Sequence, residues 1–325
     1  MDKMCNETVR CCVLLTNDNA FGYLSATMWR DYAMKVLNKA LALLLCCTLL
    51  LLPVAAQAAE VGESITCYGD DLSSEQFQQV MKLLNADLEH DTLVAVQIED
   101  EKSLLGGVVD ADKIGSRSIS SARVTLTEEG TGISVTTHNI NWVTPSMYSS
   151  ALITAGVQNA KIVVAAPVEV SGTAALAGIL KAYEQAIDTN LSSLAKAVAG
   201  NEIVLTGDLA DVIGSDEAVE LLAMVKQAIA DYNLDDYDTL RPYVVQGAKQ
   251  LGVQLTDEQI DQITRLGVEF AKLDLDPEQL ADQLNGLIGN IQKIQMAQQT
   301  ASTIFTQIKD AVQGFFNWIG SWFKR

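Results

Sequence analysis

The sequence predicts an N-terminal α/β domain with a small mixed sheet, followed by an all-α helical domain that ends in an amphipathic helix. Three observations support this α+β arrangement. Strand-like and helix-like segments alternate over residues 60–188, apolar residues recur mostly at helical spacing over 189–300, and an aromatic stripe occupies 301–325. With 325 residues, the chain is long enough for two domains that each bury a core.

A predicted secretory signal precedes the fold. Residues 34–58 begin with basic residues, continue with an apolar run and end in the small-x-small pattern Ala56-Gln57-Ala58. We expect cleavage after Ala58 and a secreted or cell-surface protein. The alternative is an uncleaved signal that anchors the protein in a membrane, although the apolar run is shorter than the roughly 20 residues that a span needs. Residues 1–33 are then an upstream extension, with translation starting at Met34.

The composition is strongly acidic. The chain carries 41 Asp and Glu against 22 Lys and Arg, which gives a formal net charge of -19. This charge disfavours nucleic acid and other polyanions as partners, because no extended basic face is available to neutralise phosphates. Solubility outside the cell explains the acidity, and weak binding of divalent cations is the alternative.

The first elements after the signal are a strand, a capped helix and a second strand. Ser64–Tyr68 is the first strand-like run. Ser73 and Gln76 have the spacing of a capping box, in which each side chain accepts a hydrogen bond from the backbone of the other residue, and they predict the start of a helix. A second strand is expected over Leu93–Ile98, followed by an acidic turn at residues 99–101.

Two further β-rich runs follow, at residues 117–126 and 133–142. Apolar and polar residues alternate in the first run, and the Gly-containing segment 128–132 separates it from the second. Two strands joined by a short loop with glycine are typical of a β-hairpin. We therefore expect these runs to pair with each other.

The segment after the predicted hairpin has the clearest signals for the start and end of secondary-structure elements in the chain. Thr144 followed by proline predicts a helix start, and Gly156 predicts the end of that helix. Ala160–Pro167 is apolar without a polar break, which indicates a central strand covered on both faces. Ser171 is expected to cap the next helix.

From residue 189 onward the pattern is helical. The one ambiguous run, Ile203–Leu205, fits either a short strand or a turn of helix. We place the α/β domain at residues 60–188 and the helical domain at 189–300. The expected helices cover residues 191–198, 218–232, 241–251, 258–273 and 278–294.

Residues 301–325 differ from the rest of the chain, because bulky apolar and aromatic residues recur there at helical spacing and two basic residues end the sequence. Such a helix suits the surface of a bilayer or an envelope protein. The alternative is that it packs into the helical domain or onto a second copy of the chain. The residues expected to make this contact are Ile308, Val312, Phe315, Phe316, Trp318, Ile319, Trp322 and Phe323.

One segment of the α/β domain has the residues of an anion site. Ser171, Gly172 and Thr173 follow the apolar strand and begin a helix, so their backbone N–H groups and hydroxyls are suited to an anionic group. Helix capping alone explains the same residues. The established phosphate-binding patterns GxxxxGK[ST] and GxGxxG do not occur in the chain.

No catalytic, cofactor-binding or metal-binding residue is assigned from the sequence. Ser193 and Lys196 form an SxxK pattern, but its partner KTG is absent, as is GxSxG. His138 is interpreted as a hydrogen-bonding residue at a strand edge. Asp231–Asp235 begins like a calcium loop but lacks the glycine and glutamate needed at the sixth and twelfth positions. Beyond the signal only Cys67 remains, which excludes an internal disulfide and predicts a small buried hydrophobe.

Three blocks of the sequence resemble a known family. They are LGGVV at 105–109, IGSRSISSA at 114–122 and GISVTTHNINWVTPSMYSSALITAGVQNAKIVVAAPVEVSGTAALAGILKAYE at 132–184. On these blocks the chain is similar to the DUF1002 family of secreted proteins from Gram-positive Firmicutes. It departs from the family at Val109, where proline is expected. The resemblance implies a secreted or surface protein, and it implies no activity and no catalytic residues.

Together these features predict a non-enzymatic, envelope-associated binding protein that meets a membrane surface or an envelope protein through its C-terminal helix. The alternative is an extracellular hydrolase or small-ligand-binding protein with a site near Asn139, Thr144 and Ser171. A deep pocket at which these three side chains converge would favour the alternative. A flat polar surface there would favour the binding protein.

Overall fold

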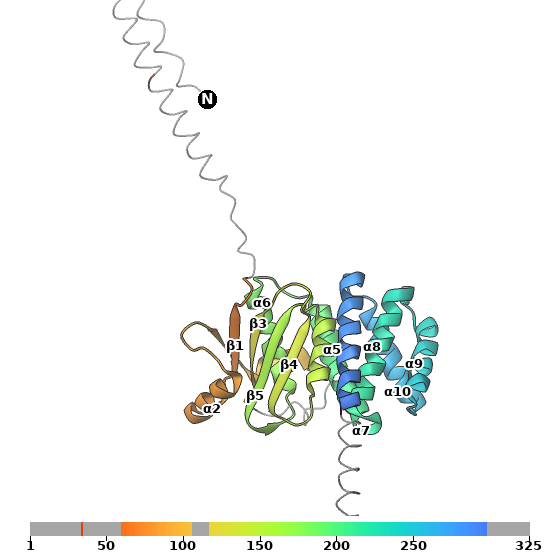
Figure 1. The fold of residues 1–325 in the computed structure, drawn as a ribbon, viewed down its shortest axis with the longest axis horizontal. Helices are drawn as coiled ribbons and strands as arrows, with labels where there is room; N and C mark the ends of the chain where they lie inside the picture. Colours follow the sequence, from red (N-terminus) through yellow and green to blue (C-terminus); the bar gives the residue numbers. More distant parts are fainter. Residues whose placement is uncertain (1–33, 35–59, 106–116, 298–325) are drawn as a thin grey trace, which may run out of the picture. The chain divides into compact units, whose positions relative to one another are not determined.

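The computed structural model describes residue 34 and residues 60–105 and 117–297 (Figure 1). Contacts divide the chain into two units, Met1–Gln57 and Ala58–Arg325. Of the first unit only Met34 is described, and it is exposed. The predicted signal, the upstream extension and the aromatic stripe at 301–325 therefore lie outside the described residues.

A mixed sheet occupies the N-terminal half of the second unit (Figure 1). Its strands are β1 (Ser64–Gly69), β2 (Thr92–Val96), β3 (Ser121–Leu126), β4 (Ile133–Ile140) and β5 (Ala160–Val170). Their order across the sheet is β2-β1-β3-β5-β4. The outer pairs β1–β2 and β4–β5 are parallel, whereas β3 runs antiparallel to both β1 and β5. The predicted small mixed sheet is thus confirmed.

The expected hairpin between residues 117–126 and 133–142 is wrong. β3 and β4 lie on opposite sides of β5 and do not pair with each other. The reason lies in β5, which is apolar on both faces and bonds to a strand on each side. A glycine-containing loop is compatible with either arrangement, so the local signal does not reveal that a later strand separates the two runs. The prediction of an interior, covered strand at Ala160–Pro167 is confirmed.

The second predicted strand is shorter than expected, because a helix replaces its end and the acidic turn. β2 ends at Val96, and α3 (Ile98–Leu105) begins two residues later. The Gln97 N–H donates to a carboxylate oxygen of Asp100 at 2.9 Å, which caps the new helix. Three acidic residues in its first turn also interact favourably with the positive end of the helix.

Two predicted helix starts are confirmed in their side-chain detail. α2 (Ser74–Leu84) has Ser73 as its cap, with Gln76 completing the capping box. α5 (Pro145–Ala155) has Thr144 as its cap and ends at Gly156 in the left-handed conformation.

The prediction that Ser171 caps the next helix is wrong. α6 (Thr173–Ala186) begins after Gly172, which has a φ of 95° and provides no side-chain cap. A Cβ at Gly172 would lie 2.5 Å from both the Tyr148 hydroxyl and Ile140. Only glycine fits this close approach with a positive φ, so it takes the cap position.

The C-terminal half is helical, as predicted. The ambiguous run Ile203–Leu205 lies inside one long helix, α7 (Ser193–Ile213). The same helix includes most of the residues expected to form a separate helix at 191–198. A final helix covers 277–297 and is the blue helix beside α5 in Figure 1. The others are α8 (Ser215–Tyr232), α9 (Tyr237–Leu251) and α10 (Asp257–Phe270).

The layers follow from the alternation along β5. Val163 and Ala165 contact α2 on one face, whereas Ile162 and Val164 belong to the main core on the other face, where α5 and α6 pack. α7 packs on α5, and α8 packs on α7. α9 packs on α8, and α10 packs on both α9 and α7. One core continues from the sheet into the helices, and the exact domain boundary at residue 188 stays a prediction.

Cys67 is part of this core, as predicted. It is buried, and its thiol donates a hydrogen bond to the Ala122 carbonyl at 3.2 Å. Burial raises the pKa of the thiol to about 12, so it stays protonated and unreactive at neutral pH. Within the part of the chain that the structure describes, no helix is both long and apolar enough to cross a bilayer.

Candidate functional site

The three residues of the predicted hydrolase or ligand site lie near the ends of β4 and β5, where the Val143 N–H donates to the Ser171 carbonyl at 3.0 Å. The Asn139 amide donates to the Ala166 carbonyl at 2.8 Å, at an irregularity in the strand. Thr144 caps α5 and also accepts a hydrogen bond from Ser215 at 3.2 Å. Structural hydrogen bonds thus occupy Asn139 and Thr144, and whether these residues bind a ligand stays a prediction.

The predicted anion site at the start of α6 faces a carboxyl group of the protein itself. The Thr173 hydroxyl donates to Glu101 Oε1 at 2.7 Å. Glu101 comes from α3 and is completely buried, and this burial raises the pKa of its carboxyl to about 7. The second oxygen, Oε2, has no hydrogen-bond partner among the described residues. An internal carboxyl group thus accepts the Thr173 hydroxyl, and the binding of an external anion at Ser171, Gly172 and Thr173 stays a prediction.

A buried ion pair between α7 and α8 is absent from the sequence prediction. Lys226 Nζ lies 2.7 Å from Glu202 Oε1, and the two residues are 4% and 1% exposed. The hydroxyls of Ser150 and Thr154 on α5 donate to the two oxygens of Glu202, and Lys226 contacts both hydroxyls. Burial lowers the pKa of Lys226, and the Glu202 carboxylate opposes this effect. We call these four residues the buried cluster.

The buried cluster contains a Ser–Lys pair, with 2.9 Å between Ser150 Oγ and Lys226 Nζ. Such a pair is able to act in nucleophilic catalysis when a substrate reaches it. Here every member of the cluster is buried and hydrogen-bonded. The geometry therefore indicates a structural role. The only signal in the sequence was the pair of hydroxyl residues at positions i and i+4, Ser150 and Thr154, on the inward part of α5.

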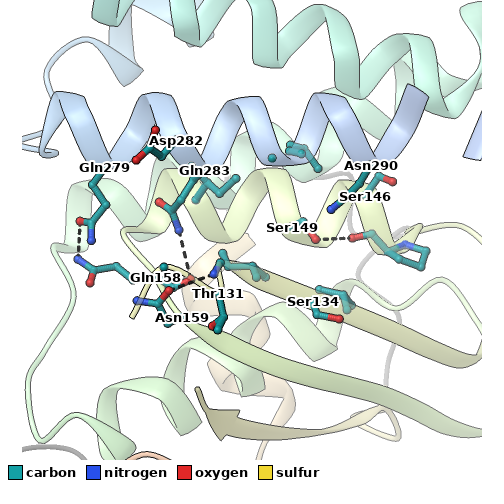
Figure 2. A pocket seen from close by; sticks show the side chains of 18 of the residues that line it. Thr131, Ser134, Ser146, Ser149, Gln158, Asn159, Gln279, Asp282, Gln283 and Asn290 are labelled. Atoms are coloured by element: carbon teal, nitrogen blue, oxygen red, sulfur yellow. Dashed lines mark hydrogen bonds between the residues drawn. The ribbon is translucent and has the colours of Figure 1, made fainter. Parts of the chain in front are cut away.

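A groove of about 830 Å³ lies on the side of α5 that faces away from the buried cluster. One wall is the beginning of β4 with the loop before it, the other wall is helix 277–297, and α5 forms the floor (Figure 2). We call it the β4 groove. Its lining combines hydroxyl, amide and carboxylate side chains with aliphatic ones such as Val135, Ile153 and Leu287, and none of its described lining residues is aromatic.

The β4 wall of the groove is a free sheet edge. The Gly132 carbonyl accepts a hydrogen bond from the Ala160 N–H at 3.1 Å. In the parallel register, the backbone N–H and C=O groups of the even-numbered residues of β4 therefore point toward β5. The backbone groups of Ile133, Val135 and Thr137 consequently point away from β5. Over the described residues, no further strand pairs with β4 on that side. Backbone donors and acceptors are thus available beside the groove.

Helix 277–297 presents two different faces. Its buried face packs leucine and isoleucine into the core, and its groove face is polar at spacings of three and four residues. A Cβ added at Gly286, in the middle of the groove face, would have no atom within 4 Å. The residues on the groove face include Gln279, Asp282, Gln283, Gly286, Asn290 and Lys293.

Hydrogen bonds join the helix wall to the loop between α5 and β5 at one end of the groove (Figure 2). The Gln283 amide donates to the carbonyls of Val157 and Gln158, at 3.0 and 3.2 Å. The Gln158 amide in turn donates to Gln279 at 2.8 Å. These bonds fix helix 277–297 relative to the sheet at the end where that helix begins. The walls and their spacing are therefore set by the fold before any ligand arrives.

The charge of the groove is unequal along its length. Glu129, Asp276, Glu278 and Asp282 lie toward the end where helix 277–297 begins, and Lys293 lies toward the other end. The carboxylates therefore favour positive charge at one end of a ligand. Among the described residues, no group of three or more His, Cys, Asp or Glu side chains is arranged to hold a metal ion.

The fold and the site define an α+β protein with a groove along a free sheet edge. The chain matches the family described as a protein of unknown function (DUF1002) over residues 68–287. It is 38% identical over 278 residues to "Uncharacterized protein YpuA" of Bacillus subtilis (strain 168), which covers 85% of this chain and 95% of that relative. The chain therefore belongs to the DUF1002 family, and the resemblance seen in the sequence is confirmed. No solved structure matches the chain.

Proposed function

We propose that this protein is a non-enzymatic binding protein, exported from the cytoplasm, whose ligand site is the β4 groove. The observation that carries the proposal is the free edge of β4 along one wall of the groove. Unpaired backbone N–H and C=O groups at a sheet edge are ready to bond another molecule. The groove volume of about 830 Å³ lies within the range of known ligand sites.

The side chains of the groove support recognition. The Ser149 hydroxyl on its floor donates to the Pro145 carbonyl at 3.0 Å, and the glutamines at its closed end bond to backbone carbonyls and to each other. These groups are held in place by the protein itself. A ligand therefore meets a preorganised surface, which reduces the entropy lost on binding.

The sequence supports two further parts of the proposal, namely export from the cytoplasm and contact with the cell envelope. The signal-like residues 34–58 support export, and the aromatic stripe at 301–325 supports contact with a membrane surface or an envelope protein. Fractionation of cells that produce the full chain or a chain without residues 301–325 tests this part. We expect the full chain in the envelope fraction and the shortened chain in the medium. Recovery of both chains in the medium would contradict envelope contact.

Photo-crosslinking in living cells tests the groove. A photoreactive amino acid replaces Asn290, which faces the groove, and in a control it replaces Lys82, which is exposed on α2 and lines neither the groove nor its neighbouring pocket. We expect a discrete adduct from position 290 only. The adduct should disappear when Gly286→Tyr fills the groove and should persist with Gly289→Tyr, which lies on the same helix outside the groove lining. An absent adduct, or one indifferent to Gly286→Tyr, would overturn the proposal.

A further inference from the structure

We infer that the β4 groove takes an extended polypeptide segment with Lys or Arg side chains, which adds to the sheet as a strand beside β4. This inference rests on the proposed function and names the class of partner. It follows from three features of the groove: the spacing of its free backbone groups, its width beside Gly286, and its charge.

The backbone spacing of β4 matches a strand. The outward-facing residues Ile133, Val135 and Thr137 are two positions apart, so their N–H and C=O groups recur about every 6.6 Å along the edge. Another extended chain presents its own groups at the same interval, and few other ligands do. Addition of a strand to a free edge is a known mode of peptide recognition.

The dimensions of the two walls agree with this occupant. β4 has 8 residues, which span about 26 Å when extended. Helix 277–297 spans about 31 Å at 1.5 Å per residue. The helix is therefore long enough to border such a strand, and the groove reaches the edge of β4 at Ile133, Ser134 and Val135, with α5 beneath it.

Gly286 gives the helix wall room at its centre. A Cβ at this position has no atom within 4 Å, and the residue lies on the groove face of the helix. Glycine inside a helix costs up to about 1 kcal/mol relative to alanine. A side chain of the added strand would occupy the open space next to Gly286. A bulky residue at position 286 would fill that space itself.

Charge selects among extended chains. Four carboxylates and one lysine are among the groove lining, and the carboxylates lie toward the end where β4 begins. Basic side chains at that end of the added strand would interact favourably with them. A second copy of this chain is disfavoured as the occupant, because each copy has a formal net charge of -19.

A library of synthetic ten-residue peptides with alternating β-branched positions and random residues between them tests the inference on the full chain. We expect selected peptides to be enriched in Lys and Arg over Asp and Glu. N-methylation of alternate backbone nitrogens, in the register that faces β4, should weaken binding about tenfold or more. The same methylation in the opposite register should change the affinity less than about threefold.

Two protein variants provide the matched control. Gly286→Tyr should abolish binding of the selected peptides, whereas Gly289→Tyr should leave it unchanged, because a Cβ at either glycine meets no neighbouring atom and only position 286 lines the groove. Circular dichroism melts confirm that both variants fold. Gel filtration reports whether a second copy occupies the edge.

The possible results separate the two proposals. An adduct at position 290 in cells, combined with an absence of basic peptide binders or with binders indifferent to N-methylation, overturns the strand inference and leaves the proposed function standing. Self-association that Gly286→Tyr removes also overturns it, in favour of a second copy. Loss of the adduct itself overturns both.

Discussion

The two sides of α5 carry similar polar residues and have different roles. Ser150 faces the buried cluster and donates to Glu202, whereas the adjacent Ser149 lines the β4 groove and donates only to the backbone of its own helix. In the buried cluster the charged groups have protein partners. In the groove, the neighbouring edge of β4 has backbone groups without a partner strand in the described part of the chain. On these two sides of α5, we therefore assign a structural role to the buried cluster and a recognition role to the groove.

The largest expected effect comes from breaking the ion pair of the buried cluster. Lys226→Met leaves the Glu202 carboxylate buried without its cation, so we expect a loss of about 3–5 kcal/mol in the free energy of unfolding. The double variant Lys226→Met with Glu202→Met should be more stable than this single variant, because no charge remains buried. Urea unfolding measures both. A single variant as stable as the wild type would mean that the ion pair is unimportant for the fold.

Glu101 is a buried carboxyl that is only half satisfied, and its effect should depend on pH. The pKa of its carboxyl is raised from 4.5 to about 7 in the folded protein. The folded state therefore holds the proton more tightly, and its stability falls as pH rises from about 4.5 to about 7, by up to about 3 kcal/mol.

Glu101→Gln should remove this pH dependence. We expect the variant and the wild type to differ little near pH 4 and the variant to be more stable near pH 8, because glutamine cannot ionise. Unfolding experiments across this range provide the measurement. An equal slope with pH in both proteins would show that Glu101 ionises as freely in the folded chain as in the unfolded one.

The adjacent serines of α5 give a smaller and more direct comparison. Ser150→Ala removes a hydrogen bond to Glu202 and another partner of Lys226, so we expect a loss of about 1–3 kcal/mol. Ser149→Ala removes only a bond to its own helix and should cost about 0.5 kcal/mol or less. Thermal melts of the two variants side by side suffice. Equal losses would contradict the distinction between the two faces.

Local features of the fold could be predicted where a few neighbouring residues decide them. Ser73 with Gln76, Thr144 before a proline, and the unbroken apolar run of β5 all have the structures that their sequence indicates. The hairpin and the Ser171 cap were wrong, because β5 and the close approach of Tyr148 to Gly172 are distant in sequence from the signals that suggested them.

The candidate site was beyond prediction for the same reason. Its walls come from β4 and from helix 277–297, which are more than 130 residues apart, and α5 contributes the floor. A polar stripe on the helix was visible, but a polar stripe is also what any solvent-exposed face looks like. The strand order that leaves β4 at the sheet edge is required to tell the two apart.

The sequence by itself determined the class of the fold, the family and the main helix caps, since these depend on residue patterns and on neighbours a few positions apart. Only the tertiary structure decided which polar residues are enclosed and which border an open groove. The physical reason is that burial and hydrogen-bond satisfaction depend on what packs from elsewhere in the chain. Ser149 and Ser150 are the same residue at adjacent positions, and they differ because α7 and α8 enclose one while the other lies beside the free edge of β4.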